Sequence, residues 1–199
     1  MDSSKKINVF IKLLSILGSI FLRFSGWTIS TKPPSSSFIA IVYPHTSNWD
    51  FFILLSGIFK LQLIPRARWG GKKSIFIWPF GPLLRALGGI PINRTSSNQA
   101  VAEIVTSLSN DKDDIIFGLS PEGTRQKKEH IKSGFYYIAQ QANLPVLPIA
   151  LDYKTKTVKV GELHYLSGKI EKDLADLYNF LESAEGKHHE DRSPFTFAS

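Results

Sequence analysis

The stretch that decides the fold is Phe38-Ile39-Ala40-Ile41-Val42-Tyr43-Pro44-His45-Thr46-Ser47-Asn48-Trp49-Asp50. Its first six residues form an apolar run with the length of a short strand. From Trp49 to Lys60, apolar residues recur at three- and four-residue steps, which predicts a helix. The polar residues in between therefore lie where a strand ends and a helix begins, at the edge of a predicted sheet.

Apolar patterns typical of strands and helices alternate along the rest of the chain. Further strands are predicted at 61–64, 89–92, 114–119 and 145–152, with 155–165 as a hairpin partner of the last; helices are predicted at 79–87, 98–108, 132–142 and 170–181. This alternation predicts an α/β fold with a mixed, largely parallel central sheet flanked by helices.

Composition fits one globular domain in contact with lipid. The 199 residues include 14 Phe and 4 Trp, a content that indicates aromatic surface at a membrane. The formal net charge of +7 favours anionic partners such as phospholipid headgroups, thioesters that carry a nucleotide, or acidic carrier proteins. No nucleic-acid partner is expected, because no recognition helix or platform of aromatic and basic residues is evident. The absence of cysteine excludes a thiolate nucleophile and Cys-ligated zinc.

The N-terminal segment 7–27 is apolar except for a few polar residues that include Lys12 and Arg23. The run 13–22, which no charged residue interrupts, is about half of the roughly 20 residues that a spanning helix needs. Bulky apolar residues recur at helical spacing at Phe10, Leu13, Leu14, Leu17, Phe21 and Phe24. The pattern predicts an amphipathic helix in the membrane interface, with a helix packed on the domain's own core and an uncleaved anchor as alternatives.

These patterns divide the chain into three parts. Residues 1–30 are expected to form the membrane-associated amphipathic segment, and residues 31–182 the globular domain. Residues 183–199 have a composition that predicts a loosely ordered tail.

His45 and Asp50 are the first candidate catalytic residues. Inside one regular helix they would lie about 140° apart, so they meet only across a turn. Ser47 followed by an acid three residues later is the pattern of a capping box, which would carry Asp50 in the first turn of a helix. Spacing alone therefore leaves two interpretations open. Either Asp50 caps a helix beside an ordinary loop histidine, or His45 acts as a base toward an acceptor hydroxyl while Asp50 fixes its ring.

Two other chemistries are less favoured for this stretch. Ser47 as a covalent nucleophile lacks the surrounding Gly-x-Ser-x-Gly pattern. The remaining histidines show no ligand spacing with His45, so no metal is predicted.

Three further blocks follow predicted strands or form them. Ser120-Pro121-Glu122-Gly123-Thr124-Arg125 offers a glycine turn and a guanidinium suited to phosphate, and 88–94 ends in a second arginine. The block 144–149 is apolar with paired prolines. Taken singly, the first block is more often merely a turn, the second ends in what is usually a solvated surface arginine, and the third is just an edge strand or strand entry.

Taken together, the four blocks resemble the four motifs of the glycerolipid acyltransferase family. His45 to Asp50 fits the His-x4-Asp motif, 89–94 the second block, 121–125 the third and 145–148 the last. The likeness extends to Lys72-Lys73 and to 132–134, so that it covers residues 38–152.

The resemblance implies roles for particular residues. His45 would be the general base and Asp50 its orienting partner. The substrate-binding residues, mainly around the acceptor's phosphate, would be Arg94, Glu122, Gly123, Thr124, Arg125 and Lys73, and the last block would contribute to the acyl-chain surface. Asn93, Leu119-Ser120 and Gln126 depart from the family's usual residues, which leaves the identity of the acceptor open.

The resemblance also implies an activity. The protein would be an O-acyltransferase that moves a fatty acyl group from coenzyme A or acyl carrier protein to a lysophospholipid, with 1-acylglycerol-3-phosphate as the leading acceptor. The thioester would be a co-substrate, and no cofactor is expected. The site of action would be the cytoplasmic face of a membrane. The alternatives are another acceptor, such as an amine-containing lyso-lipid, a lipid A precursor or a glycan, and a non-catalytic module that binds membrane or acyl carrier.

Overall fold

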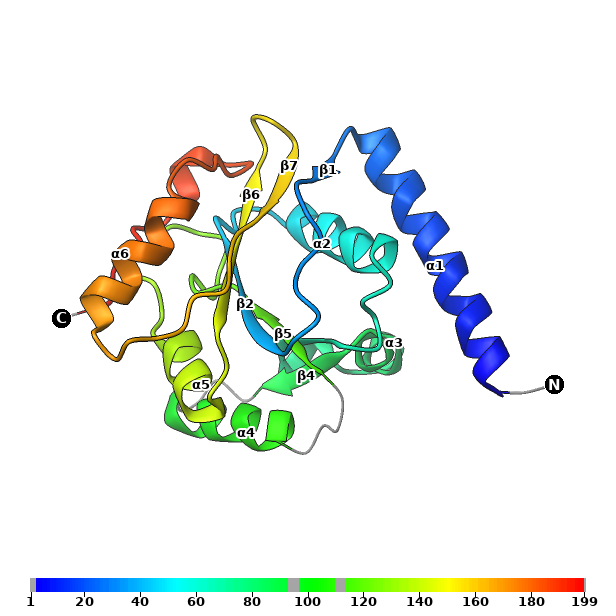
Figure 1. Ribbon diagram of the computed structural model, residues 1–199, viewed down its shortest axis with the longest axis horizontal. Coiled ribbons are helices and arrows are strands. Elements are labelled where there is room, and N and C mark those ends of the chain that lie inside the picture. Colours follow the sequence, from blue (N-terminus) through cyan, green and yellow to red (C-terminus); the bar gives the residue numbers. More distant parts are fainter. Residues whose placement is uncertain (1–2, 93–96, 110–113, 199) are drawn as a thin grey trace.

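A central sheet organises the protein, as seen in a computed structural model that describes residues 3–92, 97–109 and 114–198 (Figure 1). Within these residues the strands follow the order β1-β7-β6-β2-β5-β3-β4. Their bounds are β1 Thr28–Ile29, β2 Phe38–Tyr43, β3 Ala67–Lys72, β4 Gly89–Ile92, β5 Ile116–Leu119, β6 Val146–Asp152 and β7 Thr157–Val160. The β6–β7 pairing is antiparallel and the other strand pairings in this sheet are parallel, which confirms both the mixed, largely parallel sheet and the hairpin.

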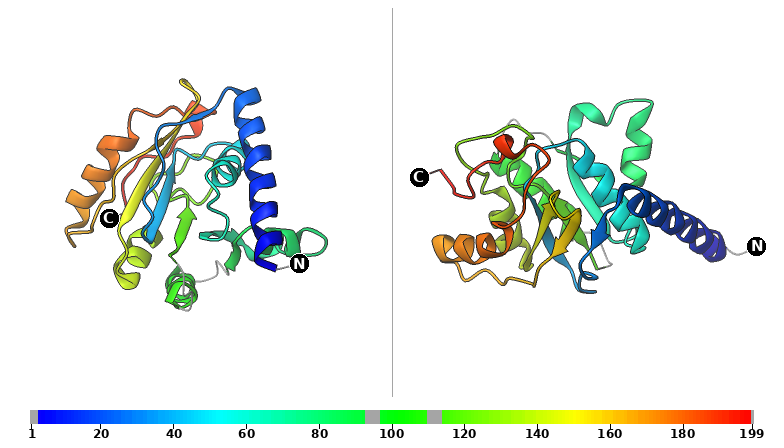
Figure 2. Two further views of the ribbon diagram at one scale, coloured as in Figure 1. Left: turned by 45° about the vertical axis from the view of Figure 1, so that its right-hand side comes forward. Right: turned by 90° about the horizontal axis from the view of Figure 1, so that it is seen from above.

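Helices cover both faces of this sheet (Figures 1 and 2). They are α1 Ser3–Ser25, α2 Trp49–Lys60, α3 Phe80–Ala86, α4 Ser97–Ser109, α5 Gly134–Ala142 and α6 Ile170–Leu181, with short 3-10 turns η1 Lys73–Ile75 and η2 His189–Asp191. Helices α4, α5 and α6 pack on one face, while α1 and α2 pack on the other. The helices predicted from periodicity are confirmed.

Strand β2 lies in the middle of the sheet and is buried along its whole length. Ile39 and Ile41 join the hydrophobic cluster under α4, α5 and α6, whereas Phe38 and Ala40 join a cluster on the opposite face. A strand covered on both faces reads as a continuous apolar run, which is why the pattern of 38–43 predicted it well.

One predicted strand is wrong. Residues 61–64 form turns that complete the C-terminal end of α2, because the amides of Leu61 and Leu63 donate to carbonyls of that helix. The strand in this part of the chain is β3, which begins at Ala67. Its sequence, Ala-Arg-Trp-Gly-Gly-Lys, carries charges and two glycines in place of an apolar alternation, so periodicity missed it.

Helix α1 confirms the predicted N-terminal helix and packs closely on α2. Gly18 allows the approach, since a Cβ atom there would lie 2.4 Å from the carbonyl oxygen of Ser56 and 2.8 Å from Cβ of Phe59. The side away from α2 exposes Val9, Phe10, Leu13, Ile16, Leu17, Ile20 and Phe24. By length and composition, Asn8–Ser25 is also long and apolar enough to cross a membrane. Contact with a membrane stays a prediction.

The tail expected to be loosely ordered is packed against the domain. Ala184, Ser193 and Phe195 are buried, and the ring of Phe195 stacks on Tyr178 of α6 and meets Tyr43 edge-on. The prediction of a loosely ordered tail is wrong because it rested on the polar composition of the segment. Composition does not show that the few apolar residues of the tail pack into the domain and order it.

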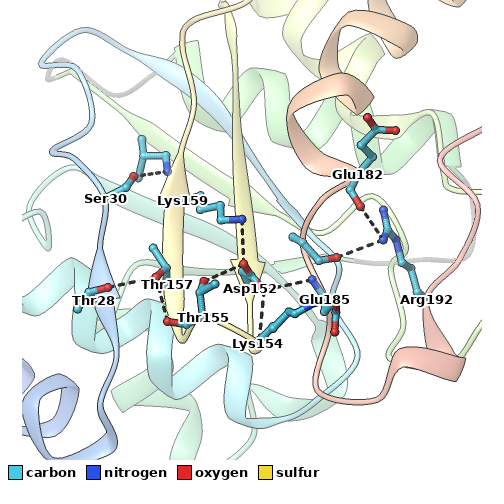
Figure 3. A network of polar contacts seen from close by, with 12 residues as sticks. Thr28, Ser30, Asp152, Lys154, Thr155, Thr157, Lys159, Glu182, Glu185 and Arg192 are labelled. Carbon is cyan, nitrogen blue, oxygen red and sulfur yellow. Dashed lines mark hydrogen bonds and ion pairs between the residues drawn. The ribbon is translucent and has the colours of Figure 1, made fainter.

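A buried carboxylate at the end of β6 ties the hairpin to this tail (Figure 3). Asp152 accepts hydrogen bonds from Nζ of Lys159 at 2.8 Å, from Oγ1 of Thr155 at 2.7 Å and from the amide of Glu185 at 3.4 Å. Burial acts to raise the pKa of Asp152, but the bonds from Lys159 and Thr155 outweigh it and hold the pKa below its ordinary value. The residue that follows, Tyr153, is thereby held at a fixed place.

Candidate active site

The predicted pair meets across the turn between β2 and α2. Nδ1 of His45 lies 2.9 Å from Oδ2 of Asp50. The Asp50 side chain is fully buried, whereas the imidazole is 22% exposed. The carboxylate is thus inside the protein, and the ring that it holds reaches the surface of a cavity.

The helix-cap interpretation holds as well. The amide of Ser47 donates to Oδ2 of Asp50 at 3.0 Å, and Oγ of Ser47 accepts from the amide of Trp49, the first residue of α2, at 3.2 Å. The bond from the amide of Ser47 to Asp50 is one half of a capping box. The other half differs, because Oγ of Ser47 accepts from the amide two residues on and not from that of Asp50. The same carboxylate thus binds both the turn before α2 and the imidazole. That His45 acts as a base, with Asp50 fixing its ring, stays a prediction.

Tyr153 is a site residue that sequence reasoning missed. Its hydroxyl donates to Oδ1 of Asp50 at 2.5 Å, and its ring packs edge-on against Trp27. Burial and the bond to Asp50 both raise the pKa of Tyr153, which keeps the hydroxyl protonated as a donor. The only available signal was position: Tyr153 follows the predicted strand 145–152, and β6 lies next to β2.

Glu122 takes a different place from the one expected. It is 1% exposed, and its carboxylate accepts the amide of His45 on Oε2 at 2.6 Å and the amide of Ser193 on Oε1 at 3.0 Å. Burial raises the pKa of Glu122, while the two backbone bonds act in the opposite direction. In this structure both carboxylate oxygens of Glu122 bind backbone amides, which gives Glu122 a positioning role toward His45. Its contact with substrate stays a prediction.

The other predicted binding residues separate into three groups. Gly123, Thr124 and Arg125 line the same cavity as His45, and the positive φ of 63° at Gly123 explains the glycine of this turn. Lys73 is exposed on η1, and it is the neighbouring Lys72 that lines the cavity. Arg94 lies outside the described residues.

The cavity that His45 lines extends to residues on both faces of the sheet and has a total volume of about 1980 Å³. Its walls are mainly apolar and include side chains of β2, α2 and β3, such as Ala40, Phe51 and Trp69. Four cations, Arg68, Lys72, Arg125 and Lys132, also line it. The space therefore combines room for a hydrocarbon chain with positive charge suited to a phosphate.

No metal chemistry is indicated by the part of the chain that the structure describes. Within it, no group of three or more His, Cys, Asp or Glu side chains is placed to hold an ion. That no metal or cofactor takes part stays a prediction.

The sequence and the fold are similar to those of known proteins. The sequence model of the family described as Acyltransferase matches residues 28–152. The chain is 29% identical over 167 residues to the 1-acyl-sn-glycerol-3-phosphate acyltransferase of Escherichia coli (strain K12), and the match covers 77% of this chain and 65% of that protein. The fold is similar to that of the 1-acyl-sn-glycerophosphate (LPA) acyltransferase PlsC from Thermotoga maritima, with a TM-score of 0.62 at 18% identity over 91% of this chain and 81% of that one.

Replacing Glu122 by Gln tests its positioning role. A carboxamide keeps one oxygen acceptor but turns an N–H donor toward the amide of His45 or of Ser193. One buried backbone donor then lacks an acceptor, which costs about 1–3 kcal/mol of unfolding free energy. We expect a folded protein with a lower midpoint in urea denaturation and a reduced kcat. Stability and kcat equal to those of the unchanged chain would contradict this role.

Replacing Tyr153 by Phe tests the third contact of Asp50. Removal of the hydroxyl leaves Oδ1 of Asp50 buried without this donor, so we expect kcat to fall about tenfold with KM little changed, as for loss of about 1.4 kcal/mol in the transition state. Steady-state kinetics separate the two constants. A change confined to KM would assign Tyr153 to substrate binding instead.

Proposed function

Because the chain belongs to the Acyltransferase family, we propose that it is an O-acyltransferase that moves a fatty acyl group from a thioester to a hydroxyl of a lysophospholipid. The observation that carries the proposal is the His45–Asp50 pair, which is held by buried contacts on the wall of a large, mainly apolar cavity. The chain spans 65% of the length of its curated relative, so acceptor and donor are argued from the site.

The geometry suits direct transfer without a covalent enzyme intermediate. Asp50 accepts the Nδ1 proton of His45, which leaves Nε2 as the basic nitrogen of the neutral ring. Nε2 removes the proton of the acceptor hydroxyl as its oxygen attacks the thioester carbonyl. The tetrahedral oxyanion collapses, the C–S bond breaks, and the departing sulfur takes the proton from His45.

Charge in the site supports a phosphate-bearing acceptor. Lys72, Arg125 and Lys132 line the cavity that His45 reaches, and Arg125 can bind phosphate through two parallel N–H donors. Thr124, which also lines the cavity, offers a hydroxyl for a phosphate or for the oxyanion. We take 1-acylglycerol-3-phosphate as the leading acceptor, in line with the name of the curated relative, and retain Arg94 as a predicted contact to its phosphate.

The donor and the location follow from the same features. An acyl chain on coenzyme A or acyl carrier protein fits the apolar part of the cavity, and this thioester is a co-substrate that needs no cofactor. The exposed apolar side of α1 supports attachment to a membrane, where acceptor and product reside. Phospholipid synthesis at the cytoplasmic face is the setting that we propose.

The test replaces His45 by Ala and compares it with His189→Ala, a histidine exposed on η2. Purified proteins receive each thioester type and a panel of lyso-lipids, and mass spectrometry identifies the acylated products. We expect acylation of 1-acylglycerol-3-phosphate to fall about 10²–10⁴-fold for His45→Ala and to stay unchanged for His189→Ala.

Two outcomes would overturn parts of this proposal. Turnover undiminished in His45→Ala would remove the general base and favour a non-catalytic module. Acylation of an amine-containing lyso-lipid or a lipid A precursor, with 1-acylglycerol-3-phosphate ignored, would replace the acceptor while leaving the chemistry in place.

A further inference from the structure

A second apolar face lies between β3 and β4, remote in sequence from α1. Five bulky side chains within nine residues point outward there: Ile75, Ile77, Trp78, Phe80 and Leu83. We call them the 75–83 patch. Trp78 is 85% exposed, and Ile77 and Phe80 are each 66% exposed. Single exposed apolar residues are ordinary, but such a cluster indicates an interaction surface.

The outward direction of these side chains is fixed by contacts beneath them. Phe76, in the middle of the segment, is buried with its ring 5.7 Å from that of Trp69, and the guanidinium of Arg85 lies over it. Nη1 of Arg85 also donates to the carbonyl of Phe76 at 3.2 Å. Because Phe76 anchors the segment inward, its neighbours Ile77 and Trp78 are held on the surface.

The charge around the patch is of one sign. Between Asp50 and Glu103 the sequence contains no Asp or Glu, whereas it contains seven Lys and Arg residues. Lys72 and Lys73 are exposed directly before the patch, and Arg85 is exposed directly after it. Bulky apolar and aromatic side chains framed by cations match the interface of a bilayer that carries anionic lipid.

The patch also lies on the helix α1 side of the molecule. In the left view of Figure 2, the segment between β3 and β4 projects on the side where α1 runs. Lys72 and Ile75 line the cavity that His45 reaches, so the patch adjoins this cavity. Trp49 and Phe52, each about half exposed at the start of α2, add apolar surface beside the turn that carries His45.

We propose that the 75–83 patch is a second membrane-docking surface, which inserts Ile77, Trp78 and Phe80 into the interface of an anionic bilayer. Together with α1, the 75–83 patch gives the domain two separate contacts with the bilayer. Two contacts fix the orientation of the domain, whereas one helix alone would leave the domain free to rotate. The part of the cavity lined by Lys72 and Ile75 then faces the lipid, and an acceptor reaches His45 without leaving the membrane.

The experiment uses the absence of cysteine from the chain. Ile77→Cys and the control Tyr165→Cys each carry an environment-sensitive fluorophore; Tyr165 is 73% exposed in the connection between β7 and α6. Both proteins are mixed with vesicles of phosphatidylglycerol and phosphatidylcholine. We expect a blue shift of the emission at residue 77 and none at residue 165.

A partition measurement with the same vesicles complements the label. The triple variant Ile77→Ser, Trp78→Ser, Phe80→Ser is expected to lower the partition coefficient about tenfold or more, while Tyr165→Ser stays close to the unchanged chain. An unshifted label at residue 77 on vesicles, or a triple variant that binds as the unchanged chain does, would overturn the proposal. A shift caused by acidic acyl carrier protein and not by vesicles would overturn it too, in favour of a carrier-docking face. None of these readouts needs turnover, so they are independent of the acyl-transfer test.

Discussion

The carboxylate of Asp50 is fully buried and accepts hydrogen bonds from the imidazole of His45, the amide of Ser47 and the hydroxyl of Tyr153. A buried charge without partners would be strongly destabilising, so these three bonds are a condition of the fold as well as of the site. They join the turn after β2, the first turn of α2 and the end of β6. The fold requires hydrogen-bond partners for the buried carboxylate of Asp50, and this requirement fixes the position of the His45 ring.

A second buried carboxylate holds the same histidine from the other side. Glu122 binds the amide of His45, and through Ser193 it also fixes the C-terminal tail. The turns after β2 and β5 and the end of β6 come together because these strands are parallel neighbours, and parallel strands bring their carboxyl ends to one edge of a sheet. The largely parallel topology thus converts blocks distant in sequence into one site.

The sequence predicted those parts of the structure that depend on local patterns. Strand β2, the helices and the meeting of His45 with Asp50 follow from periodicity, capping residues and motif order. The sequence patterns did not predict those features that depend on contacts between residues far apart in the chain. Strand β3 lacks an apolar alternation and forms through its pairing with β4 and β5. The tail is ordered by the packing of Phe195. Glu122 was predicted to bind substrate, although the structure buries its side chain. Tyr153 was missed because its partner lies 103 residues away in sequence.

The central claim is that Asp50 fixes His45 as the tautomer protonated on Nδ1, with Nε2 presented to the cavity. Nitrogen-15 NMR of the imidazole, recorded in alkaline buffer where the ring is neutral, measures this directly. The account predicts a proton on Nδ1 in the unchanged chain and a shift toward the other tautomer in Asp50→Asn. A neutral ring protonated on Nε2 in the unchanged chain would contradict it.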